Sequence, residues 1–203
     1  MSWLRAVIPG VFAVLASAAN AQAPPAAVAR AAIEKVSADG ASLIVRTRTE
    51  KDETIRLTDA TTVTRVVPAK LADVKAGAFV GVAAVPDADG ALKALELHIF
   101  PESMRGTGEG FHPFDLAPNS SMTNGAIAAR VEGVAGTTLT VAYRGGRQTI
   151  VIDAETPIVA FAPGVRADLA PGAAIVARGA RQDDGSIAAA HILVGENGFV
   201  PPL

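Results

Sequence analysis

Short runs of alternating apolar and polar residues, separated by turn signals, fill most of the chain from about residue 30 onward. Such alternation is the period of a strand with one buried face. The inward positions of two successive runs are Leu43, Val45, Ile55 and Leu57. Several runs are separated by residue pairs typical of tight hairpins, namely Asp39-Gly40, Asp89-Gly90, Gly145-Gly146 and Asp184-Gly185. The pattern therefore predicts an all-β protein in which helix is scarce.

The same pattern occurs twice. Residues 30–100 and 128–194 can be laid over one another at an offset near 95, with small gaps in the first part. The clearest correspondence joins residues 72–77 to residues 167–172, and the order of features is kept throughout. Because self-similarity at a fixed offset indicates a repeated structural unit, the sequence predicts two tandem modules.

We expect these modules to cover residues 28–100 and 126–198, joined by an irregular linker over residues 101–125. A single helical turn is expected in each module, at residues 70–75 and 166–170. About five or six short strands in about 70 residues suit a small closed barrel, because closure removes exposed strand edges. The prediction is two OB-like antiparallel β-barrels, with small β-sandwiches as the alternative.

The order of strands and turns resembles a domain found in bacterial exported proteins, which is catalogued as a domain of unknown function and often occurs in tandem. The residues that carry the resemblance are Asp73, Gly77, Asp89 and Gly90 in the first copy and Asp168, Gly172, Asp184 and Gly185 in the second. The resemblance covers nearly the whole chain after the N-terminal segment. It implies a β-barrel-like fold and an exported location, and it implies no particular activity.

The N-terminus has the features of a secretory signal. Arg5 supplies a positive start, residues 6–19 are uncharged and largely apolar, and Ala19-Asn20-Ala21 fits a small-x-small cleavage site before Gln22. The apolar run is shorter than the roughly 20 residues of a membrane-spanning helix. We therefore expect a signal peptide over residues 1–21, with an N-terminal signal helix and no stable membrane span after cleavage.

Composition narrows the compartment and the partners. The chain has no cysteine, so disulfides cannot hold the modules together in a periplasmic or secreted protein. Removing residues 1–21 takes away only Arg5 among the charges, so that 18 basic residues become 17 against 20 acidic ones. Single-stranded nucleic acid requires a basic groove with aromatic platforms, whereas the basic residues of one hairpin (Arg46, Arg48, Lys51 and Arg56) alternate with acidic ones. We expect a solvated strand face there and no nucleic-acid partner.

Polar side chains that could bind a metal gather near the linker. The predicted ligands are His98, Glu109 and His112, with Met104, Asp115 and Met122 as further ligands. Histidine with methionine suits copper, and histidine with carboxylate suits other divalent metals. The spacings match no defined metal motif, and the other interpretation is a Gly-rich tether whose Phe111 and Phe114 pack onto one module. A divalent metal or copper is the one cofactor that the sequence suggests.

Catalytic motifs are missing from the sequence. There is no Gly-x-Ser-x-Gly elbow, no His-Glu-x-x-His and no Walker loop. His191 lies in the last predicted strand of its module, where alternation places it on the solvent face. We therefore expect a non-enzymatic binding or scaffolding module of the cell envelope, with an unknown protein or small ligand as partner. Periplasmic metal handling by the linker is the alternative.

Overall fold

The computed structural model describes residues 25–133 and 136–202, so the signal peptide and signal helix expected over residues 1–21 lie outside the described residues. In chain order the strands are β1 (Ala26–Val36), β2 (Ser42–Thr47), β3 (Asp52–Arg56), β4 (Thr62–Pro68), β5 (Phe79–Pro86), β6 (Leu92–Ile99), β7 (Gly110–Pro113), β8 (Ser121–Gly133), β9 (Gly136–Tyr143), β10 (Gly146–Ile152), β11 (Ile158–Pro163), β12 (Ala174–Arg181) and β13 (Ile187–Gly195). The described helices are the 3-10 turns η1 (Leu71–Asp73), η2 (Glu102–Met104), η3 (Arg166–Asp168) and η4 (Glu196–Gly198). The prediction of an all-β protein is confirmed.

The predicted turns form where the sequence places them. Gly90 and Gly185 occupy equivalent hairpins, and each has a φ of +82°, which a residue with a side chain rarely adopts. In the second of these turns the Asp184 carboxylate accepts a hydrogen bond of 3.0 Å from the backbone N–H of Ser186. The turns η1 and η3 lie within the two predicted helical segments. The turn residues in the sequence therefore predict correctly where these strands end.

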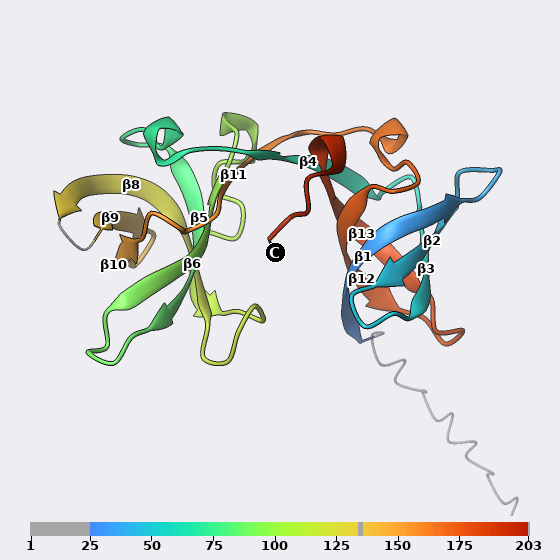
Figure 1. Cartoon of the computed structure of the whole chain (residues 1–203), viewed down its shortest axis with the longest axis horizontal. Coiled ribbons are helices and arrows are strands. Elements are labelled where there is room, and N and C mark those ends of the chain that lie inside the picture. Colours follow the sequence, from blue (N-terminus) through green and yellow to red (C-terminus); the bar gives the residue numbers. More distant parts are fainter. Residues whose placement is uncertain (1–24, 134–135, 203) are drawn as a thin grey trace, which may run out of the picture.

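Two closed rings of paired strands build the molecule (Figure 1). The first ring runs β1–β2–β3–β13–β12 and back to β1, and the second runs β8–β9–β10–β6–β5 and back to β8. In each ring four contacts are antiparallel. The remaining contact, β3 with β13 or β10 with β6, is parallel and joins two residue pairs. The two rings therefore have the same strand order.

Each ring combines strands from both sequence repeats. The first ring takes β1, β2 and β3 from the first repeat and β12 and β13 from the second, whereas the second ring takes β8, β9 and β10 from the second repeat and β5 and β6 from the first. The repeats at 28–100 and 126–198 are therefore units of sequence and do not each close on themselves. Alternation records which face of a strand is buried but not which copy supplies its neighbour, so the sequence pattern could not distinguish the two arrangements.

The strands β4 and β11 carry the chain between the rings and pair with each other, from Val159↔Pro68 to Pro163↔Thr64. β4 also pairs with β13 of the first ring, and β11 pairs with β6 of the second ring, in parallel in both cases. The two rings are thus joined through one continuous path of paired strands.

Three apolar clusters hold this arrangement together. In the first ring Ile33 and Leu43 of one repeat pack with Ile192 of the other. In the second ring Leu97 packs with Leu139 of the other repeat. The third cluster lies between the rings and contains residues of both crossover strands and of β12 and β13, namely Val66, Val159, Phe161, Val176 and Leu193. Since each ring interior is built from both repeats, burial of its apolar surface requires both.

The segment predicted as an irregular linker over residues 101–125 is only partly irregular. It contains η2, the strand β7 and the first part of β8. β7 pairs with β8 from Gly110↔Asn124 to Pro113↔Ser121. The many glycines of the segment indicate turns, and they concealed the short alternating stretch that forms β7. Within the residues that the structure describes, no helix is long and apolar enough to cross a membrane.

Candidate functional site

A buried polar pair lies on the face of β6 that points away from the interior of the second ring. Glu96 and His98 are two residues apart and therefore share one face, whereas Leu97 between them is part of the ring core. Their side chains are 1% and 3% exposed, and His98 Nε2 lies 2.9 Å from Glu96 Oε1. The His98 ring lies against Phe161 of the crossover strand β11, with 5.1 Å between the ring centroids. The pair is thus placed at the contact between the rings.

The first ring presents basic side chains from the same side. Arg178 on β12 and His191 on β13 are paired in register, and the guanidinium of Arg178 lies 5.5 Å from the centroid of the Phe114 ring. Burial lowers the pKa of Arg178, while the charges of Asp115 and Glu96 act in the opposite direction. Arg30, whose charge adds to the effect of burial, and Glu96 both have smaller effects than Asp115.

His191 is half-buried and contacts a crossover strand. Its Nδ1 lies 2.6 Å from Thr62 Oγ1 on β4. Burial, with the charge of Arg178 as a second cause, lowers the pKa of His191 below its ordinary value of 6.5. His191 was expected on the solvent face of its strand. Its side chain is instead half-buried between β13 and β4, and the lowered pKa favours the neutral imidazole.

The contact between Glu96 and His98 lacks the alignment of a hydrogen bond. Neither carboxylate oxygen of Glu96, nor Nε2 of His98, has a hydrogen-bond partner in the described structure, although the 2.9 Å separation meets the distance criterion of an ion pair. A buried polar group without a partner costs about 1–3 kcal/mol. An unaligned contact in the interior compensates the desolvation of the two side chains poorly, so their burial outweighs the short distance between them.

The structure does not bring the three predicted metal ligands together. His98 lies beside Glu96, Glu109 Oε1 accepts a hydrogen bond of 2.7 Å from the backbone N–H of Arg144, and His112 Nε2 lies 3.0 Å from the carbonyl oxygen of Gly108. Across residues 25–133 and 136–202, no group of three or more His, Cys, Asp or Glu side chains is arranged to hold a metal ion. The hypothesised site of His98, Glu109 and His112 is not assembled in this structure.

The further predicted ligands have separate environments. Met104 packs against the apolar cluster between the rings, Asp115 pairs with Arg30 at 3.3 Å, and Met122 is buried on β8. Of the two phenylalanines expected to pack, Phe114 does contact the cluster between the rings, but Phe111 is 45% exposed. The segment is thus a packed part of the fold with one exposed aromatic side chain.

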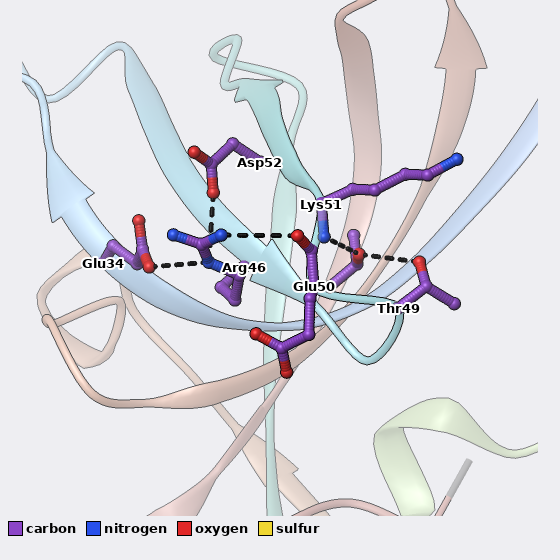
Figure 2. Close-up of polar contacts among 7 residues, drawn as sticks. Glu34, Arg46, Thr49, Glu50, Lys51 and Asp52 are labelled. Carbon is purple, nitrogen blue, oxygen red and sulfur yellow. Dashed lines mark hydrogen bonds and ion pairs between the residues drawn. The ribbon is translucent and has the colours of Figure 1, made fainter.

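Figure 2 shows the charged hairpin of the first ring. Arg46 Nε lies 3.0 Å from Glu34 Oε1 and 3.1 Å from Asp52 Oδ1, and its guanidinium also donates to the carbonyl oxygen of Glu50. The hydrogen bond that Arg46 donates to Glu34, together with the charges of Asp52 and Glu34, raises the pKa of Arg46. Lys51 points away from this group (Figure 2). Arg46 is therefore matched by acidic neighbours, as expected for a solvated strand face.

A polar pocket of about 390 Å³ opens where β3 meets β13. Two ion pairs line it, Arg56 with Asp184 and Arg181 with Glu53. Asp52 also lines the pocket and pairs with Arg46 outside it, so each charged side chain of the lining already has a partner of opposite charge.

One strand has an open edge. Among the described strands, β7 is the one that pairs with a single neighbour, β8, whereas each of the others has at least two. Phe111 lies in the middle of β7 and is the aromatic residue among the exposed large apolar residues. Pro113 ends the strand. Sequence reasoning missed this edge, although the alternation Gly-Phe-His-Pro was a signal for it.

These observations define a class: all-β proteins built of two repeats that exchange their last strands. The chain belongs to the family described as a domain of unknown function (DUF5666), which matches residues 31–98 and 128–192. The resemblance predicted from the sequence is thereby confirmed. Each matched segment begins in the first strand of a repeat and ends in its last, so one family unit contributes to both rings. Searches of curated proteins and of solved structures returned no match.

Proposed function

We propose that this chain is an exported, non-enzymatic binding or scaffolding module of the cell envelope, and that its partner is an extended polypeptide segment. The N-terminal residues 1–21, with their positive start, apolar run and small-x-small site, support export to the periplasm or beyond. The proposal makes the two rings a rigid support and assigns binding to one exposed element.

We also infer that each ring is an OB-like barrel. Five strands in the cyclic order first, second, third, fifth and fourth, with the third and fifth parallel, support this inference because that fold has the same strand order. A small β-sandwich, the alternative, would leave its two sheets without the contact between the third and fifth strands. In each repeat the crossover strand β4 or β11, followed by a 3-10 turn, lies between the third strand, which belongs to one ring, and the fourth strand, which belongs to the other.

The open edge of β7 is the observation that carries the binding proposal. An edge strand presents backbone N–H and C=O groups that a second extended chain can pair with. Phe111 at the middle of the edge offers apolar surface that a partner would bury, which is how aromatic side chains anchor contacts. Because Pro113 lacks an N–H and β7 is four residues long, the edge suits a short segment and opposes unlimited strand addition.

The experiment places a photo-crosslinking residue at position 111 of the full-length protein in cells that export it. Val165 is the matched control, because it is an exposed apolar residue outside the strands of the sheet. The proposal predicts a discrete adduct with a polypeptide from position 111 and none from position 165. Equal adducts from the two positions, or none from position 111, would show that β7 is not the binding element.

A further inference from the structure

Because the two repeats are equivalent, their strands could close into two rings in either of two ways. In the observed exchange, β5 and β6 complete the ring of β8–β10, and β12 and β13 complete the ring of β1–β3. In the other closure, here called self-closure, each repeat would complete its own ring. The ring interiors have the same strand order in both cases, so a feature outside the repeated pattern must select between them.

The segment between the repeats contacts strands of both. Arg105 donates a hydrogen bond of 3.0 Å to the carbonyl oxygen of Gly77, just before β5, and its guanidinium lies 5.8 Å from the ring centroid of Phe79. Asn124 on β8 donates one of 3.0 Å to the carbonyl oxygen of Gly108. We call residues 105–109 the clasp. It holds the last strands of the first repeat against the first strands of the second.

A third contact of the clasp extends it to the neighbouring hairpin. The carboxylate of Glu109 accepts a hydrogen bond of 2.7 Å from the backbone N–H of Arg144, in the turn between β9 and β10. The clasp therefore reaches β5, β8 and the β9–β10 turn together. Under self-closure β5 would leave this group, and the contacts of Arg105 with Gly77 and Phe79 could not coexist with those of Asn124 and Arg144.

The pairing of β5 with β8 has a matching steric feature. Gly81 lies opposite Asn124, and a Cβ atom added at Gly81 would come within 2.5 Å of Asn124 Oδ1 and 3.0 Å of the Phe100 ring. The equivalent strand of the second repeat carries Val176 at this place, opposite Arg30. Self-closure would therefore put Val176 against Asn124, where the side chain has no room unless Asn124 gives up its bond to the clasp.

We propose that the clasp and the Gly81–Asn124 contact select exchange over self-closure. This is a role for the residues that the two repeats do not share. Each of the three clasp contacts is a hydrogen bond, and a hydrogen bond of ordinary strength shifts an equilibrium by several-fold. Together with the steric term they favour exchange by well over tenfold.

The test uses the full chain with a specific protease site inserted at Pro118–Asn119, an exposed turn outside the clasp. Cleavage leaves one repeat on each fragment. With exchange the fragments stay interlocked and elute as one species, and labelled fragments do not replace unlabelled ones under native conditions. With self-closure each fragment forms its own folded ring, and labelled fragments replace unlabelled ones freely.

The decisive variant exchanges the two residues, Gly81→Val with Val176→Gly, so that the small residue now favours self-closure. A second variant, Arg105→Ala with Glu109→Ala, opens the clasp and remains informative if the first does not fold. Glu34→Ala with Arg46→Ala removes a surface ion pair between two strands of the same repeat and is the control. We expect the interlocked fraction to fall at least tenfold in a folded test variant and to be unchanged in the control. An interlocked fraction equal to the parent's in both test variants would overturn the proposal.

Discussion

Replacing Ile192, which belongs to the second repeat, by alanine should loosen the strands that the first repeat contributes to the first ring. Ile192 is fully buried on β13 and packs in one cluster with Ile33 and Leu43 of the first repeat. Truncation of a buried isoleucine to alanine costs about 2–5 kcal/mol, which is a large part of the about 5–15 kcal/mol that stabilises a typical domain. Since the lost contacts reach β1 and β2, those strands should open more often.

Native-state hydrogen exchange measures this opening amide by amide. In Ile192→Ala, protection should fall in β2 and β3 by several orders of magnitude, because about 1.4 kcal/mol corresponds to a factor of ten, and it should change far less in β9 and β10. Leu97→Ala is the matched control, because Leu97 is the equivalent residue of the other repeat and is also fully buried. It should give the reverse pattern. Loss of protection confined to the mutated residue's own repeat would refute the exchange of strands between the repeats.

Three further results are expected. Because burial and Arg178 lower the pKa of His191 below 6.5, the unfolded chain binds a proton at this residue first as the pH falls. His191 therefore makes the free energy of unfolding decrease as the pH drops through about 6.5 toward the lowered pKa. His191→Gln should flatten this part of a plot of unfolding free energy against pH, and an unchanged slope would contradict the assignment. Copper, zinc and nickel should leave the unfolding temperature unchanged, since Glu109 and His112 are held by separate backbone groups; a rise that His112→Ala abolishes would restore the metal hypothesis. Phe111→Ser should change the unfolding free energy by no more than about 0.5 kcal/mol, because the ring is 45% exposed, yet it should prevent crosslinking from position 112; a large loss of stability would mean that Phe111 serves the fold.

Alternation and turn chemistry were sufficient to predict the all-β class and the hairpin turns of the repeats, but not β7 in the segment between them. Leu43 and Val45 are buried as predicted, and Asp184-Gly185 forms the expected turn. Partner choice between the copies was beyond the sequence because it depends on a few side chains with no local signature. Gly81 reads as an ordinary strand glycine until Asn124 is placed against it.

The candidate site was predicted less well than the fold. His98 was correctly placed in the last strand of its repeat, but its partner is Glu96 rather than the residues of the linker. The spacing of two residues on a strand was a usable signal, because it puts both side chains on one face. The environment of that face could not be predicted, since it is created by the first ring and by Phe114 and Asp115 of the connecting segment.

Engineered disulfides test the central claim, that each ring is closed by strands of both repeats, most directly. The chain has no cysteine of its own, so introduced pairs report without competition. Ala32 lies opposite Ala174 in the observed pairing of β1 with β12, at the spacing of adjacent antiparallel strands that a disulfide can bridge. Self-closure would instead place Ala174 opposite Ala126, which here lies opposite Phe79.

The measurement is the yield of intramolecular disulfide in monomeric, oxidised protein, read by mass spectrometry of the linked peptides. Exchange predicts an efficient bond in Ala32→Cys with Ala174→Cys and none in Ala126→Cys with Ala174→Cys. A bond between positions 126 and 174, with positions 32 and 174 left reduced, would contradict the claim.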